Sequence, residues 1–135
     1  MSKEKSIVGK IDSITVTITE EMINNFAKVS GDFNPIHVNE QYAKKTIFKK
    51  RISHGMLVAS FISRVIANKL PGPGTIYLSQ NLSFKHPVFI ADQVTAQVEV
   101  LEKKKEKPIY KLKTTCKNQN DVVVIEGESY VKYEK

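Results

Sequence analysis

One segment limits the possible folds of this chain more than any other: SHGMLVASFISRVIANKLPG, residues 53–72. Its large apolar side chains cover most of the circumference of a helix rather than one stripe: Met56, Leu57, Val58, Phe61, Ile62, Val65, Ile66 and Leu70. A helix that is apolar nearly all round must be buried in the middle of a fold. Ser53 is expected to cap its start, and Pro71 with Gly72 to end it.

The residues that follow this helix alternate between apolar and polar side chains, which is typical of half-buried strands. Such runs occupy residues 76–84, 94–100, 110–116 and the stretch VVVIEGESYVKYE from residue 122. Upstream, residues 14–19 predict a first strand, and residues 20–29 predict a helix closed by Gly31. The expected fold class is therefore α+β, with four antiparallel strands after the helix forming a curved sheet wrapped around it. One sheet around one helix leaves an open edge, so we expect a homodimer.

Length and composition describe an ordinary globular chain. Its 135 residues predict one domain, spanning residues 1–135. The single cysteine, Cys116, excludes an intrachain disulfide and leaves no cysteine pair for a metal site. The opening MSKEKSIVGK has no apolar core of signal-peptide length, and no segment approaches the length of a membrane span. We therefore expect a cytoplasmic protein.

The stretch SGDFNPIHVN, residues 30–39, holds the most conspicuous polar cluster. Pro35 excludes a regular helix through it, and a strand would point Asp32 and His37 to opposite faces. Only a non-repetitive loop can bring these two side chains together. The alternative is purely structural, because Asp32 or Asn34 could simply bond to nearby backbone amides, as such residues do in turns.

The net charge of +7 favours an anionic partner, either nucleic acid or a small phosphorylated ligand. The lysines of residues 103–107 have no interleaved aromatic residues to stack on bases, so we read them as a solvated turn between strands. A second basic group precedes the long helix and is a candidate for phosphate contacts, although solvated charge explains it equally well: Lys44, Lys45, Lys49, Lys50 and Arg51.

Two motifs carry a resemblance to a known family. GDFNPIH at residues 31–37, followed by SHGMLVAS at residues 53–60, resembles the MaoC-like hot-dog family, and within it the short (R)-specific enoyl-CoA hydratases. Residues 70–100 look like the continuation of the same family. The resemblance implies a homodimer without a cofactor, whose acyl-CoA site lies between the long helix and loops of the partner. The implied reaction is reversible addition of water to a trans-2-enoyl thioester, giving an (R)-3-hydroxyacyl thioester.

By this resemblance, Asp32 and His37 hold and activate one water molecule. The roles are physically sensible, because water is a poor nucleophile at neutral pH and a positioned base must accept its proton. The backbone N–H of Gly55, at the start of the long helix, is the expected donor to the thioester oxygen.

Other residues have supporting roles in this interpretation. Asn34 is expected to fix the loop, and Lys49, Lys50 and Arg51 to contact the phosphates of CoA. The hydroxyl of Ser63, two turns after Gly55, either faces the site or, equally well, bonds back to a carbonyl of its own helix. His54 is read as a flanking residue. No serine lies in a nucleophile elbow and no residues have metal-ligand spacing, so covalent and metal mechanisms are disfavoured.

Several alternative functions remain open. The nearest is a 3-hydroxyacyl dehydratase acting on acyl carrier protein, because it runs the same chemistry backwards. Another is a non-catalytic acyl-CoA-binding protein with the same fold. A thioesterase of this fold and a nucleic-acid-binding protein are less favoured.

Overall fold

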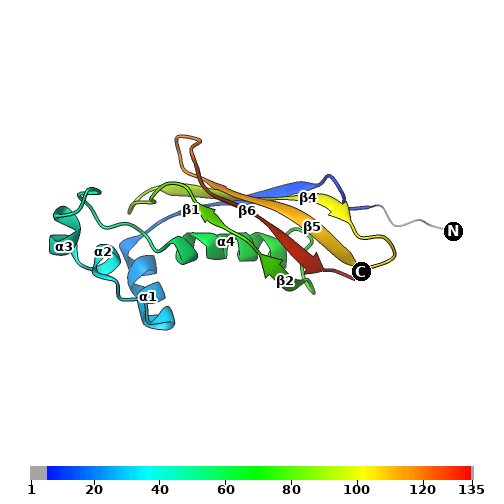
Figure 1. The fold of residues 1–135 in the computed structure, drawn as a ribbon, viewed down its shortest axis with the longest axis horizontal. Helices are drawn as coiled ribbons and strands as arrows, with labels where there is room; N and C mark the ends of the chain where they lie inside the picture. Colours follow the sequence, from blue (N-terminus) through cyan, green and yellow to red (C-terminus); the bar gives the residue numbers. More distant parts are fainter. Residues whose placement is uncertain (1–5, 135) are drawn as a thin grey trace.

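A computed structural model describes residues 6–134. One long helix, α4 (Gly55–Asn68), runs along one face of an antiparallel sheet, and three shorter helices gather at one end of the molecule (Figure 1). The short helices are α1 (Glu20–Ser30), α2 (Pro35–Val38) and α3 (Glu40–Lys44). This is the arrangement of a sheet around a central helix that the apolar segment predicts.

The strands of the sheet follow the order β1-β4-β5-β6-β2, with β3 also paired to β6. Their bounds are β1 (Ile11–Thr17), β2 (Ile76–Gln80), β3 (Ser83–Phe84), β4 (Gln93–Lys103), β5 (Ile109–Lys117) and β6 (Val123–Lys132). All pairings are antiparallel. Strands β1 and β2 therefore lie at the two open edges of the sheet.

The core lies between α4 and the sheet. The side chains of β4 alternate between buried and accessible, so that Val94, Ala96, Val98 and Val100 are fully buried. They face a helix whose buried residues lie on most of its sides: Leu57, Val58, Ala59, Phe61, Ile62, Val65 and Ile66. The sheet thus explains the apolar face of α4 that it covers, whereas Met56, which the sequence placed on the same buried surface, is 58% exposed.

The strand expected at residues 76–84 is divided into β2 and β3. Asn81 lies at the break, where its N–H donates to the Glu128 carbonyl at 2.9 Å and its Oδ1 accepts from the Glu128 N–H at 3.0 Å. The backbone of β6 comes so close that a Cβ on Gly127 would lie 1.9 Å from the Asn81 carbonyl oxygen. Glycine at residue 127 therefore permits an irregularity that the alternation of side chains does not predict.

Two predictions about the helices are wrong. Pro35 does not exclude a helix but opens α2 as its first residue, with Asn34 as the N-cap, because proline is tolerated at the first position of a helix. Gly31 ends α1 with φ of 79°, and Asn39 caps α3 by accepting from the Tyr42 N–H. The expectation that Ser53 caps α4 is wrong, because the N-cap residue is His54 and no side chain caps this helix. Ser53 instead donates to the His54 carbonyl at 3.1 Å.

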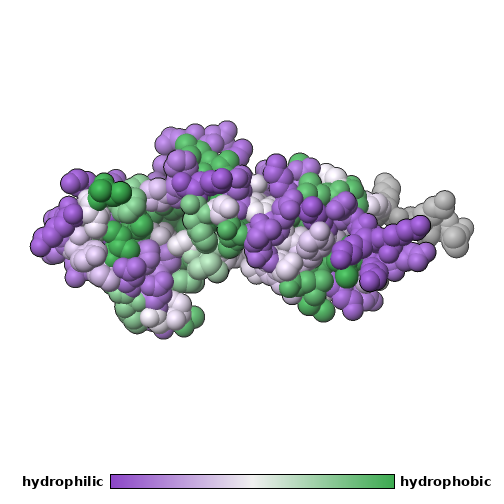
Figure 2. Space-filling model, viewed as in Figure 1, coloured by the Kyte–Doolittle hydropathy of each residue, from purple (hydrophilic) through white to green (hydrophobic). Residues whose placement is uncertain are grey.

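The surface differs between the two ends of the molecule (Figure 2). Hydrophilic residues cover the turn between β4 and β5, which confirms a solvated turn for the lysines there. The end with α1, α2 and α3 exposes apolar side chains: Val29, Phe33, Tyr42 and Ile47.

Residues 1–5, which form part of the segment read as lacking a signal peptide, lie outside the described residues. Within residues 6–134, no helix is long and apolar enough to span a membrane.

Candidate active site

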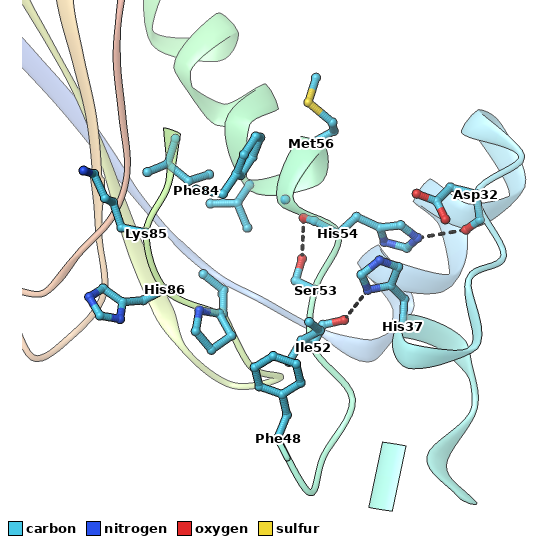
Figure 3. A pocket seen from close by; sticks show the side chains of 15 residues that line it. Asp32, His37, Phe48, Ile52, Ser53, His54, Met56, Phe84, Lys85 and His86 are labelled. Atoms are coloured by element: carbon cyan, nitrogen blue, oxygen red, sulfur yellow. Dashed lines mark hydrogen bonds between the residues drawn. The ribbon is translucent and has the colours of Figure 1, made fainter. Parts of the chain in front are cut away.

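A pocket of about 620 Å³ opens at the N-terminal end of α4. The loop after α1 supplies Asp32 and α2 supplies His37, while the residues around β3 supply Phe84, Lys85 and His86 on the opposite wall (Figure 3). The lining is mostly apolar with a few polar groups, which is the common character of a small-molecule site.

The backbone fixes the His37 ring. Its Nδ1 lies 2.8 Å from the Ile52 carbonyl oxygen, and because a carbonyl can only accept, Nδ1 carries the proton. Nε2 of the neutral ring is then free to accept a proton. Burial has the largest effect and lowers the pKa of His37 from its ordinary value. The Ile52 hydrogen bond opposes this shift, His54 adds a smaller lowering effect, and Asp32 opposes it least. The neutral, proton-accepting form is therefore favoured near neutrality.

Asp32 is exposed and lies beside His37. Its Oδ1 accepts from the Asn34 N–H at 3.2 Å, so the structural interpretation of this loop holds for that oxygen. The same carboxylate belongs to a group of three residues with His37 and His54. One carboxylate oxygen and one ring nitrogen from each histidine all lie within 4.8 Å of one another. Asp32 and His37 do come together, but not within one loop as predicted, because Asp32 lies in the loop after α1 and His37 lies on the short helix α2.

His54 is the main site residue that the sequence interpretation missed. It is only 1% exposed, and its ring lies between those of Phe26 and His37, with centroid separations of 4.9 Å and 4.1 Å. Its Nε2 lies 2.9 Å from the Asp32 carbonyl oxygen. The sequence did contain one signal that could have identified His54 as a site residue. It is a polar residue directly before the first turn of a buried helix.

Gly55 opens α4 and lines the pocket. Within the described part of the chain its N–H has no backbone or side-chain partner, as expected for the first turn of a helix. A Cβ at this position would lie 2.6 Å from Cε1 of Phe84. Besides allowing close approach to a backbone amide, glycine therefore makes room for the Phe84 ring.

Asn34 and Ser63 differ in their relation to the pocket. Asn34 caps α2, its Oδ1 accepting from the Ile36 N–H at 3.3 Å, so it does fix the loop. Ser63 does not line the pocket of Asp32 and His37. It lines a neighbouring cavity of about 550 Å³, which shares Met56 with the first.

The basic run before α4 divides into two kinds of residue. Lys49 and Lys50 are exposed, and Nζ of Lys50 lies 4.9 Å from the centre of the Phe89 ring. Arg51 is 5% exposed and donates to three partners inside the chain: the His37 carbonyl at 2.6 Å, Glu20 at 2.7 Å and Asn24 at 2.8 Å. The phosphate contact expected of Arg51 is therefore not supported, because its guanidinium already ties α1 to the loop of His37.

The trio of Asp32, His37 and His54 contains ligand types that metal ions use. One nitrogen of each imidazole bonds to a backbone carbonyl, at Ile52 for His37 and at Asp32 for His54, and these bonds do not exclude a metal ion because they leave the other nitrogen of each ring. The geometry suits an acid–base pair with one fixed neighbour, which is the role that water addition needs.

Comparison with known proteins agrees with this geometry. The family described as MaoC like domain matches residues 3–122. An (R)-specific enoyl-CoA hydratase from Rhodospirillum rubrum is 52% identical over 123 residues, covering 91% of this chain and 85% of the relative. A mitochondrial 3-hydroxyacyl-[acyl-carrier-protein] dehydratase from Arabidopsis thaliana is 40% identical, covering 95% of this chain and 78% of the relative.

Among solved structures, an (R)-hydratase from Aeromonas caviae superposes with a TM-score of 0.92 at 42% identity. The match covers 94% of this chain and 96% of that one. The superposition confirms the α+β hot-dog fold expected from the sequence, with its antiparallel sheet around one long helix.

Proposed function

Because the chain belongs to the MaoC-like domain family, we propose that it is an (R)-specific enoyl-CoA hydratase. It adds water reversibly to trans-2-enoyl-CoA and forms (R)-3-hydroxyacyl-CoA. The observation that carries the proposal is the meeting of Asp32 and His37 at a largely apolar pocket, beside the first N–H of α4, which has no partner among residues 6–134.

His37 and Asp32 act on a single water molecule in this proposal. Nε2 of His37 is available to accept a proton, because Nδ1 is committed to Ile52. The oxygen of the water forms a bond to C3 of the substrate as its proton leaves, and a proton is delivered to C2. Asp32 shares and orients the water. Two such positioned groups contribute to rate through general acid–base catalysis, typically by factors of about 10² to 10⁴.

The negative charge that develops on the thioester oxygen needs a hydrogen-bond donor. The N–H of Gly55 supplies one, and the partial positive charge at the N-terminus of α4 adds to it. Removal of one such donor costs about 3 kcal/mol of transition-state stabilisation. Lys49 and Lys50 remain candidates for contacts with the phosphates of CoA, because both are exposed at the approach to the pocket wall formed by Phe48.

A direct assay tests the proposal. Crotonyl-CoA is incubated with the purified protein, loss of the enoyl absorbance is followed, and the product is resolved by chiral analysis. The (R)-3-hydroxy product is expected. An (S) product would contradict the stereochemistry, and lack of turnover with crotonyl-CoA bound would favour a non-catalytic acyl-CoA-binding protein.

A second candidate is a 3-hydroxyacyl-[acyl-carrier-protein] dehydratase. It is favoured by the relative of that name at 40% identity. Both carriers present a phosphopantetheine arm, so the pocket does not distinguish them. Relative kcat/KM on CoA and carrier-protein thioesters of the same acyl chain separates the two.

Assembly and location are part of the proposal. A homodimer is supported by the open edge of β2, which carries the exposed apolar residues Ile76, Tyr77 and Leu78. We propose a cytoplasmic location, and cell fractionation tests it. The test has a real alternative, because the Arabidopsis relative is a mitochondrial dehydratase.

A further inference from the structure

His54 occupies a position where a polar side chain is costly. It is 1% exposed, and its Nδ1 is buried without a hydrogen-bond partner among the residues that the structure describes. An unsatisfied buried polar atom typically costs about 1–3 kcal/mol, so an apolar residue would serve packing alone better. The residue therefore needs an explanation other than packing.

The second nitrogen supplies part of that explanation. Nε2 lies 2.9 Å from the Asp32 carbonyl oxygen, and since this oxygen only accepts, His54 must carry its proton on Nε2. The bond joins the residue that caps α4 to the loop that holds the Asp32 carboxylate. It links segments 22 residues apart in the sequence at the point where the two halves of the site meet.

The ring contacts supply the rest. The His54 and His37 rings lie 4.1 Å apart at an angle of 34°, and Phe26 supports His54 from α1 with centroids 4.9 Å apart. In Figure 3 the rings of His54 and His37 lie next to each other below the Asp32 carboxyl. The His54 ring thus contacts both members of the proposed acid–base pair. It bonds to the backbone carbonyl of Asp32 and lies against the ring of His37.

We propose that His54 is a positioning residue that holds the Asp32 carboxylate and the His37 imidazole at a fixed separation beside the first turn of α4. This inference rests on the proposed hydratase function and deepens it. The hydrogen bond to the Asp32 carbonyl fixes the position of the loop that holds Asp32. The contact between the His54 and His37 rings fixes the orientation of the His37 imidazole. Acid–base groups must be held closely, because a displacement of about 1 Å can cost about 10²-fold in rate.

Three variants separate the two contacts. His54→Gln keeps an amide donor for the Asp32 carbonyl but removes the ring. His54→Phe keeps a ring against His37 but removes the donor, and His54→Ala removes both. We expect kcat on crotonyl-CoA to fall by about 10- to 100-fold in His54→Ala and by less in the other two. KM should change little in all three, because the buried side chain offers the substrate almost no surface.

A remote core variant controls for loss of stability. Val100→Ala removes a fully buried side chain of β4 near the far end of the sheet, next to Gly9. It should lower Tm, as the truncation His54→Ala should, but leave kcat unchanged. Wild-type kcat in folded His54→Ala, or a loss of kcat that simply follows Tm across all four variants, would overturn the proposal.

Long-range ¹H–¹⁵N spectra of the histidine rings add a measurement that needs no turnover. In the wild-type protein the proton of His54 should lie on Nε2, with Nδ1 bare, and His37 should show one tautomer protonated at Nδ1. A proton on Nδ1 of His54 would overturn the inference even if no variant folds. Absence of hydration by the wild-type protein with the expected spectra would contradict the hydratase function instead.

Discussion

At the scale of single residues, the acid–base pair is held by the backbone around it. His37 donates from Nδ1 to the Ile52 carbonyl, and Oδ1 of Asp32 accepts from the Asn34 N–H. These two bonds leave Nε2 of His37 and Oδ2 of Asp32 for the proposed catalytic role. The turn-like bonding and the proposed catalytic role are therefore compatible. The first oxygen of Asp32 shapes the loop, and the second, which has no hydrogen-bond partner among the described residues, is the one proposed to bind the water molecule.

We predict that Asp32→Asn and His37→Gln each lower kcat on crotonyl-CoA by about 10² or more. Both changes preserve size, so the loop should keep its shape, and the loss reflects missing acid–base function. Steady-state kinetics and circular dichroism on the same samples give the result. Near-normal turnover in either folded variant would show that its residue is structural.

The lowered pKa of His37 leads to a prediction about pH. Hydration needs the neutral ring, so kcat/KM should fall only at pH below the ordinary histidine value of 6.5. A kcat/KM profile measures this, and an acidic midpoint above 6.5 would contradict burial as the main influence. The unfolded chain binds this proton more readily than the folded one, so His37 also makes folding less favourable as pH falls below 6.5.

At the scale of elements, the segment between α3 and α4 combines two functions within three consecutive residues. Lys49 and Lys50 face solvent, whereas Arg51 turns inward and bonds to Glu20 and Asn24 of α1. The segment thus ties α1 to the loop of His37 while presenting two cations outside. Similar charges in sequence have different neighbours in space.

We predict that Lys49→Ala/Lys50→Ala raises KM for crotonyl-CoA more than it lowers kcat, because phosphate contacts bind substrate and transition state alike. Each exposed contact is worth about 0.2–1 kcal/mol, so the double variant is needed for a clear effect. The rise should be greater at low salt and absent with a short pantetheine thioester that lacks the nucleotide phosphates. An equal rise of KM on both substrates would show that these lysines are solvated surface charges and do not contact the phosphates.

Arg51→Ala is expected to behave differently from its neighbours. Removal of its three hydrogen bonds should lower the free energy of unfolding by about 2 kcal/mol. Lys50→Ala, the matched surface change, should stay within about 0.5 kcal/mol of the wild type. Urea unfolding measures both, and an Arg51→Ala protein as stable as Lys50→Ala would mean that these bonds contribute nothing.

At the scale of the whole molecule, the sheet covers α4 from one side and leaves apolar surface uncovered elsewhere. Met56 on α4 and Phe84 on β3 are each more than half exposed, and so is Ile76 on the β2 edge. Surface of this kind next to an open strand edge is typical of an interface. A second copy of the chain would bury it.

We predict a homodimer, with about twice the chain mass in sedimentation equilibrium at low micromolar concentration. Leu78→Lys, on the β2 edge and 49% exposed, should shift the equilibrium toward monomer. Leu101→Lys, on β4 and 36% exposed, is the matched control and should not. A stable and fully active wild-type monomer would contradict a site that is completed by the partner.

The sequence alone determined the class of fold, and it predicted that Asp32 and His37 lie close together. An apolar surface around most of α4 requires a covering sheet, and alternation in β4, β5 and β6 supplies it. Gly31 acts locally, through its allowed backbone angles, so the end of α1 could be predicted, whereas the sequence reading of Pro35 missed the short helix that it opens. The division of the β2 region could not, because it depends on the distant Gly127.

Tertiary structure alone decided which polar residues join the pair. Nothing near His54 in the sequence indicates that its ring would lie between Phe26 and His37, because these contacts connect α1, α2 and the start of α4. Arg51 and Lys50 have the same charge, and only the placement of Glu20 and Asn24 separates a buried tie from a surface cation. Burial and hydrogen bonding depend on what the rest of the chain brings nearby, whereas periodicity and turn chemistry depend on adjacent residues.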